Sequence, residues 1–294
     1  MRLLLPCSLL LVSSFNNDIV QGLSLETASS SASSSSTSCS LRQTQFPNSI
    51  PVSDADIATL IRQTGQVNPS KAAIGIPSCT NCRHGFPQAF AMDPLPPSNT
   101  KGRINSGLLK LTCPLLVQAV DALEDDGIIP LWNDRYVKQD QVLQEDIQQT
   151  HALHAQVRQK LLQQQPQQPE DNSDIIRQKL GEKGAEAFLR AGVAGSSPES
   201  TDLKCLHAWL ADALFRNNNN KVGNLIQKEL QARGVSMTGT DDCRAYCDPN
   251  MTGAFSPPKP RNKQRLRTGK ELGRRKRRKQ ELLQQLQPGD DDEL

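Results

Sequence analysis

The sequence lacks the short motifs that mark several of the commonest enzyme classes. It contains no Walker phosphate loop, no dinucleotide-binding glycine fingerprint and no serine-nucleophile elbow. These absences argue against a P-loop nucleotide hydrolase, a dinucleotide-dependent dehydrogenase and an α/β-hydrolase. Internal repeats are missing as well. The function has to be sought in residues that lie far apart in the sequence.

Long apolar runs and aromatic residues are also scarce. The run LLLPCSLLLV near the N-terminus is too short to span a bilayer, so we expect no transmembrane segment in the mature chain. Aromatic residues make up 4% of the chain and are missing from the basic segment 259–281. A tract without aromatic rings can contact phosphates but offers no base stacking for specific recognition of single strands.

The two ends of the chain are predicted to be disordered. Residues 1–22 are typical of a signal peptide, because an arginine precedes an apolar run and small residues follow it. Residues 23–50 form a serine-rich linker. Residues 251–294 form a basic tail that ends in DDEL, and its segment 259–281 carries 12 Lys or Arg against 2 Glu. We expect this segment to contact any polyanionic partner, such as nucleic acid.

The chain ends indicate a compartment. The terminal Asp-Glu-Leu resembles a retrieval signal of the endoplasmic reticulum, with an aspartate in place of the usual lysine or histidine before it. Together with the signal-like start, it predicts a protein of the secretory pathway in the lumen of the endoplasmic reticulum. The alternative is a plastid, reached through a two-part targeting signal whose second half is the serine-rich segment.

Residues 51–250 are predicted to form one globular domain of the α+β class. The domain is expected to be mainly α-helical, with a small antiparallel β element between two disordered termini. Ser53 and Asp54 favour the start of a first helix, which Gly65 ends. The runs GFPQAFAMDP and SGLLKLTCP indicate paired strands. Pro114 favours the first turn of a further helix.

Four later segments have helical periodicity. A glutamine-rich helix over about 138–164 is expected on the surface, with His151 and His154 solvated or with His151 and Arg158 in contact with the core domain. A second helix runs through Phe188. A third, capped by Ser200 or Thr201, contains LKCLHAWLADAL. The fourth carries Val222, Leu225, Ile226 and Leu230.

The third of these helices contains a cysteine and a histidine two positions apart. On a regular helix His207 falls inside the apolar arc and Cys205 points the other way. Two such side chains cannot both reach one metal ion without local distortion. One interpretation is therefore a buried histidine beside a cysteine that acts as a small hydrophobic residue.

Six of the eight cysteines lie in the predicted globular domain. Cys79-x-x-Cys82 is half of a zinc-ribbon pattern, and the spacing of Cys243 and Cys247 also allows chelation. Six cysteines also pair evenly, and the secretory signals favour disulfides because that compartment is oxidising. The count alone leaves both interpretations open.

Several short blocks appear in the order in which they occur in a family named domain of unknown function 501, which is widespread in bacteria. They are CRHGFP, LTCP, LEDDG, GVAG, KCLHAWLA and NKVG, and they lie between about residues 75 and 248. The chain resembles this family, although Lys221 stands where proline is usual. The resemblance supplies no activity. It implies that a shared pattern contains Cys82, Cys113, Cys205, His207 and the closing cysteines Cys243 and Cys247.

We expect this set to bind zinc or an iron–sulfur cluster, with the ligands gathered from separate segments. The exposed amides of a helix N-terminus are expected to lower the pKa of the Cys113 thiol. One alternative is a disulfide-stabilised or thiol-redox protein of the secretory pathway, with Cys79 and Cys82 as the redox pair. Another is anion or nucleic-acid binding through the tail. The sequence assigns no catalytic residue and leaves open whether the protein is an enzyme.

Overall fold

The computed structural model describes residues 46–65, 69–79, 82–96, 104–164, 169–251 and 277. The predicted signal peptide, most of the serine-rich linker and nearly all of the basic tail lie outside these residues. The expectations about those segments stay predictions.

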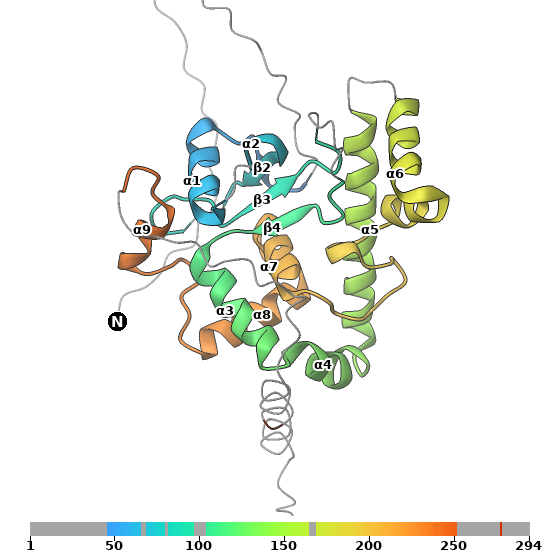
Figure 1. Ribbon diagram of the computed structural model, residues 1–294. Coiled ribbons are helices and arrows are strands. Elements are labelled where there is room, and N and C mark those ends of the chain that lie inside the picture. The colour runs from blue at the N-terminus through green and yellow to red at the C-terminus, as the bar shows by residue number, and fades with distance from the viewer. Residues whose placement is uncertain are drawn as a thin grey trace, which may run out of the picture. The chain divides into compact units, whose positions relative to one another are not determined.

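The described strands form one antiparallel sheet. They are β1 (Ser49–Ile50), β2 (Ala73–Pro77), β3 (Ala89–Met92) and β4 (Leu109–Leu111), and they lie side by side in that order. Figure 1 labels β2, β3 and β4. β3 and β4 pair from Ala89 opposite Leu111 to Ala91 opposite Leu109, which confirms the predicted paired strands. β1 and β2 were not predicted. β1 has only two residues, and β2 contains Gly75 and Pro77, which weaken a strand signal.

Helices make up most of the described chain, so the predicted fold class, mainly helical α+β with a small antiparallel sheet, is confirmed. The helices are α1 (Asp54–Thr64), α2 (Pro69–Ala72), α3 (Pro114–Asp125), α4 (Ile128–Trp132), α5 (Gln141–Gln163), α6 (Pro169–Leu189), α7 (Leu206–Phe215), α8 (Lys221–Ala232) and α9 (Arg244–Cys247). A π-helical turn, η1 (Asn133–Val137), follows α4, and the 3-10 turns η2 (Val193–Gly195) and η3 (Asp241–Cys243) precede α7 and α9. No described helix is both long and apolar enough to cross a bilayer.

Local signals set the ends of the first helix as predicted. The Ser53 hydroxyl accepts a hydrogen bond from the Asp56 amide, and the Asp56 carboxylate accepts one from the Ser53 amide. This reciprocal pair satisfies two amides that the first turn of α1 would otherwise leave free. Gly65 ends the helix in the left-handed conformation, at φ 63°.

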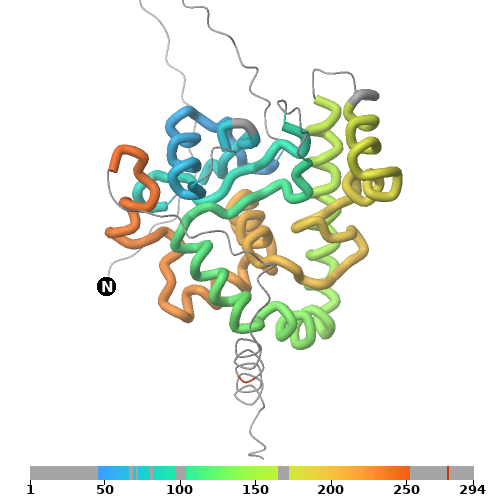
Figure 2. The backbone as a smooth tube through the Cα atoms, viewed as in Figure 1, coloured from blue at the N-terminus to red at the C-terminus, as the bar shows by residue number. Residues whose placement is uncertain are grey.

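Helix α7 lies in the middle of the core. It contacts β4, α3 and α8, and its residues Leu206, Leu210 and Phe215 are fully buried. A β carbon on Gly223 of α8 would lie 2.2 Å from the β carbon of Ala213. The two helices therefore approach each other as closely as a glycine allows. Figures 1 and 2 also show the C-terminal helix α9 beside α1, two segments from opposite ends of the described chain.

Helix α5 has an exposed face, as its glutamine content indicates, but its other face is buried in the domain. Its apolar positions Leu143, Ile147 and Leu161 are buried, and so are the polar residues His151, His154 and Arg158 on the same side. The expectation of solvated histidines was wrong, whereas the alternative, contact of His151 and Arg158 with the core domain, is what the structure shows. The Arg158 guanidinium donates to the carbonyls of Asn105, Ser106 and Ala191.

Candidate metal centre

Helix α7 begins later than the sequence indicates. Neither Ser200 nor Thr201 caps it; Cys205 is the N-cap, with extended backbone at φ −141° and ψ 110°. The side chain of Asn133 accounts for the difference. Its Oδ1 accepts from the Leu203 amide at 2.9 Å, and its Nδ2 donates to the Leu203 carbonyl at 3.2 Å. These two bonds hold Leu203 outside the helix and delay the first turn.

The late start of α7 brings Cys205 and His207 to the same side. Because Cys205 precedes the helix, the regular 100° step does not apply between the two residues. The Sγ atom of Cys205 lies 3.9 Å from Nδ1 of His207. The prediction that they point apart was therefore wrong.

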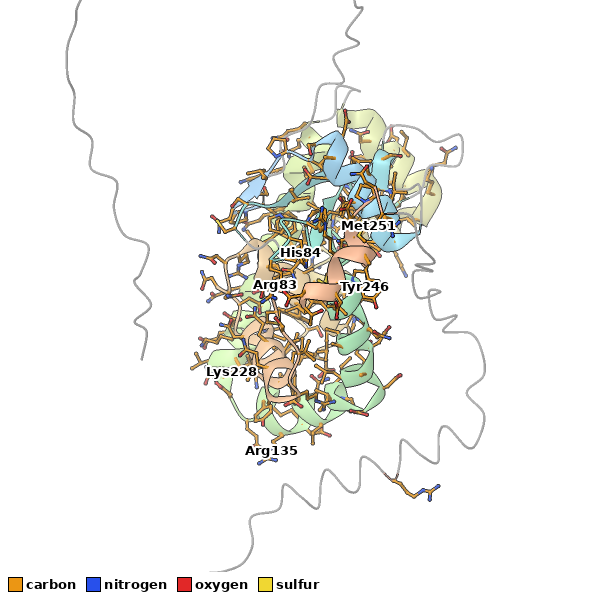
Figure 3. The ribbon with its side chains drawn as sticks, turned by 90° about the vertical axis from the view of Figure 1, so that its left-hand side faces the viewer. Arg83, His84, Arg135, Lys228, Tyr246 and Met251 are labelled. Atoms are coloured by element: carbon orange, nitrogen blue, oxygen red, sulfur yellow. The ribbon has the colours of Figure 1, made fainter. Side chains whose placement is uncertain are left out.

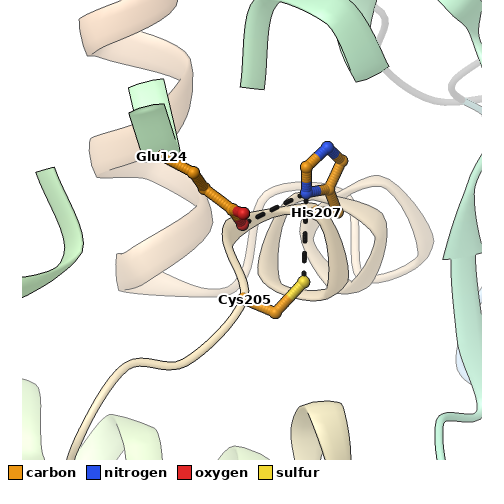
Figure 4. Close-up of side chains that lie close together, drawn as sticks. All are labelled: Glu124, Cys205 and His207. Carbon is orange, nitrogen blue, oxygen red and sulfur yellow. Dashed lines mark hydrogen bonds and ion pairs between the residues drawn. The ribbon is translucent and has the colours of Figure 1, made fainter. Parts of the chain in front are cut away.

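A third side chain, Glu124 in the last turn of α3, completes the group. Its Oε1 lies 3.1 Å from His207 Nδ1 and accepts a hydrogen bond from the Leu206 amide at 2.8 Å. Figure 4 shows the carboxylate and the thiol converging on one nitrogen of the ring. The ligand atoms of Glu124, Cys205 and His207 all lie within 4.8 Å of one another.

Sequence reasoning missed Glu124. It lies within the LEDDG block, but a carboxylate among three acidic residues near a helix end looks like ordinary surface charge. Only the packing of α3 against α7 places it at the first turn of α7.

The other ring nitrogen of His207 faces an acceptor. Nε2 lies 3.3 Å from the carbonyl oxygen of Val117 and 3.6 Å from Oδ1 of Asp121. A carbonyl oxygen can only accept, so Nε2 carries a proton. Nδ1 is then the nitrogen whose lone pair can bind a metal ion, and it is the nitrogen that faces Cys205 and Glu124.

Without a bound metal ion, both ring nitrogens of His207 carry a proton at neutral pH. Burial lowers the pKa of His207, but hydrogen bonds to Cys205 and Glu124 and the charges of both outweigh burial and raise this pKa to about 10. At neutral pH a proton then occupies the space between Nδ1 and the two acceptors. A metal ion at this position takes the place of that proton.

The structure separates the six predicted ligands into two groups. Cys205 and His207 lie with Glu124 near the C-terminal end of α3, whereas Cys113 caps its N-terminal end. Eleven residues of helix correspond to about 16 Å. Cys82, Cys243 and Cys247 lie on the Cys113 side, since their charges act on the thiols there. Cys79 is exposed, and all six cysteines of the described domain are free thiols.

The expected lowering of the Cys113 pKa does not occur. Burial raises the pKa of this thiol and outweighs the amides of Leu116 and Leu115, which lower it. The helix N-terminus does act on the thiol as expected, but the thiol has too little water around it for the thiolate to be favoured.

His151 and His154 are buried rather than solvated, which corrects the prediction. His154 Nε2 lies 2.8 Å from Oδ1 of Asp212, and His151 Nδ1 accepts from the Val193 amide at 3.1 Å. Burial is the main cause that lowers the pKa of His151 to about 4, so its ring is neutral at pH 7. The two rings fasten α5 to α7 and to η2.

Comparison with known proteins matches the middle of the chain to a family model. The model of the family described as "Protein of unknown function (DUF501)" matches residues 78–228. No curated protein and no solved structure matches the chain. The matched range contains Glu124, Cys205 and His207, and it ends before Cys243 and Cys247.

Proposed function

Since the chain belongs to the DUF501 family, described as of unknown function, we propose a function from the geometry alone: the protein binds a zinc ion through Glu124, Cys205 and His207. One observation carries the proposal. Nδ1 of His207 faces the carboxylate and the thiol, while Nε2 is held by the Val117 carbonyl.

The donor set favours zinc. Imidazole, thiolate and carboxylate are the three side-chain donors that zinc accepts, and the thiolate argues against magnesium and calcium. Zinc bonds of about 2.0–2.3 Å at tetrahedral angles separate the ligand atoms by about 3.4–3.6 Å. The distances from His207 Nδ1, 3.1 Å to Glu124 and 3.9 Å to Cys205, lie on either side of that range. Small side-chain shifts are enough to seat the ion.

The surroundings orient each ligand. The Leu206 amide holds the Glu124 carboxylate, and the Val117 carbonyl with Asp121 holds the ring of His207. Such outer contacts fix the tautomer and the direction of a ligand and tune its affinity for metal.

Three protein ligands leave one tetrahedral position open. The side chains of Glu124 and His207 are 20% and 21% exposed, so the group lies within reach of solvent. A zinc ion with three protein ligands keeps a water molecule or a substrate group in the fourth position, and the pKa of such water falls to about 7. The site we propose is therefore of the open kind on which zinc enzymes depend.

The test is zinc binding by the full-length protein and its variants. We expect Cys205→Ser and Glu124→Gln each to lower zinc affinity at one site at least tenfold, measured by competition with a fluorescent chelator. Cys79→Ser is the matched control, because Cys79 is exposed and lies outside both groups. If Cys205→Ser binds as much zinc and as tightly as Cys79→Ser, the proposal is wrong.

A second function fits the same side chains, and the 3.9 Å contact between Cys205 and His207 favours it. A thiol beside an imidazole is the arrangement of a cysteine nucleophile. Alkylation separates the two functions. A bound zinc ion protects Cys205 from iodoacetamide until a chelator is added, whereas a nucleophilic thiol reacts quickly with or without the chelator.

A further inference from the structure

Four buried cysteines come from three separate parts of the chain. Cys82 follows β2 in a short loop, Cys113 lies between β4 and α3, and Cys243 and Cys247 belong to η3 and α9. Each is at most 5% exposed, and all four are free thiols. Buried free cysteines are common, but four in one place need a further explanation.

Backbone hydrogen bonds fix the loop that carries Cys82. Its amide donates to the Phe86 carbonyl at 3.0 Å, and its carbonyl accepts from the Gly85 amide at 2.8 Å. Gly85 adopts φ 80°, a conformation that favours glycine. The loop then joins the end of β4, because the Gln88 carbonyl accepts from the amides of Thr112 and Cys113. Cys82 and Cys113 are thereby brought together.

The C-terminal segment is tied to the same loop. The Arg83 amide donates to the Thr238 carbonyl at 2.8 Å, and Gln88 Nε2 donates to the Met237 carbonyl at 2.7 Å. Arg83 also pairs with Asp241. Figure 3 looks onto this face, with Arg83 and His84 labelled on the loop and Tyr246 on α9.

Helix α1 closes the group from another side. Gln63 Nε2 donates to the Pro87 carbonyl at 2.9 Å and to Cys247 Sγ at 3.2 Å. The guanidinium of Arg62 donates twice to the Ala245 carbonyl. A β carbon on Gly239 would lie 2.7 Å from Cys243 Sγ, so a glycine makes room for that sulfur.

The neighbouring thiols act on Cys113 and Cys247, so the four sulfur atoms lie near one another. Burial raises the pKa of Cys113, and the charges of Cys82 and Cys243 add to the rise. Burial also raises the pKa of Cys247 to about 12. The Gln63 hydrogen bond lowers this pKa, and the charges of Cys113, Cys82 and Cys243 raise it further. Four free thiols buried near one another offer a metal cation a complete set of ligands, because one cation stabilises every thiolate at once.

We propose that Cys82, Cys113, Cys243 and Cys247 hold a structural metal centre, distinct from the site at Glu124. Four thiolates occupy all positions of a tetrahedral zinc ion or of an iron–sulfur cluster, so the centre is closed to substrate. No three of these sulfur atoms, all in the described part of the chain, lie within 4.8 Å of one another. Zinc has to draw them to about 3.8 Å, whereas a cluster bridges wider separations. In either form the centre fastens η3 and α9 to the sheet.

The first measurement is the metal content and the absorption spectrum of full-length protein purified under reducing conditions without a chelator. We expect about one colourless zinc equivalent, or iron with inorganic sulfide and visible charge-transfer bands, beyond any zinc at the Glu124 site. Cys113→Ser and Cys247→Ser lose this metal. Cys79→Ser and Cys205→Ser keep it, so the two proposed sites fail or succeed independently.

A second measurement on the wild-type protein covers the case in which a serine variant does not fold. Alkylation followed by mass spectrometry is expected to find Cys79 labelled from the start, and Cys82, Cys113, Cys243 and Cys247 labelled together once a strong chelator is added. Folded wild-type protein that holds no metal beyond the Glu124 site overturns the proposal. Disulfides within the group overturn it as well.

Discussion

Gly223 lies against Ala213 so closely that a β carbon on residue 223 would stand 2.2 Å from the β carbon of Ala213 and 3.3 Å from the Trp209 carbonyl oxygen. This contact sets the distance between α8 and α7, and α7 in turn carries His207. The spacing of two helices and the position of a candidate ligand therefore depend on one absent methyl group.

Gly223→Ala is expected to destabilise the domain. The added methyl has no space, so the helices must separate, and overpacking of this kind costs about 1–3 kcal/mol. The measurement is urea unfolding followed by circular dichroism. Lys228→Ala on the exposed side of α8 is the control and should lie within about 0.5 kcal/mol of the wild type. Equal midpoints for the two variants would mean that α8 adjusts freely.

His151 makes stability depend on pH. Its pKa is about 4 in the folded state, below the ordinary value of 6.5. The unfolded chain therefore binds the proton more readily between these values, and stability falls as the pH falls from about 6.5 to 4. The loss reaches up to about 3 kcal/mol at pH 4.

The variant that tests this pH dependence and its control are both on α5. His151→Gln should flatten the dependence of unfolding free energy on pH over that window, whereas Gln149→Ala, an exposed change on the same helix, should leave it unchanged. A His151→Gln protein as sensitive to acid as the wild type would assign the acid sensitivity to other groups.

Gln63 is expected to support the four-cysteine centre from outside. Its amide donates to Cys247 Sγ, and loss of a contact to a ligand typically lowers metal affinity 10–100-fold. Gln63→Leu should therefore release the structural metal to a chelator at least tenfold faster. Asp54→Asn, at the exposed start of the same helix, is the control. Identical release from both variants would contradict this role.

The basic segment 259–281, of which only residue 277 is among the described residues, is expected to bind polyanions. Its binding to heparin or RNA should weaken steeply as salt rises, because each phosphate contact releases counterions. Deleting 259–281 should abolish the binding, and deleting 282–294 should not. Retained binding without the basic segment would place the interaction on the folded domain.

Some of the fold could be predicted because the signals are local. Ser53, Asp56 and Gly65 bound α1 through contacts within a few residues, and Pro114 marks the start of α3 in the same way. The start of α7 could not be predicted, since Asn133, far away in the sequence, holds Leu203 outside the helix. This tertiary contact overrides the local capping preference of Ser200.

The candidate sites, too, could be predicted only in part from the sequence. The cysteines and His207 could be selected by residue type and by family pattern. Their separation into two groups depends on which end of α3 each one meets, and the part played by Glu124 depends on the packing of α3 against α7. Hydrophobic periodicity predicts which face of a helix is buried, but it does not predict which element packs against that face.

The positions of the four buried cysteines also set an order of events during synthesis. Cys82 and Cys113 leave the ribosome long before Cys243 and Cys247, which lie near the end of the described domain. Chains are made from the N-terminus, so the loop and α3 exist first without their partners. In the metal centre that we propose, the early pair has to stay reduced and unblocked until α9 emerges. The docking of α9 is thus the step that completes the interior of the domain.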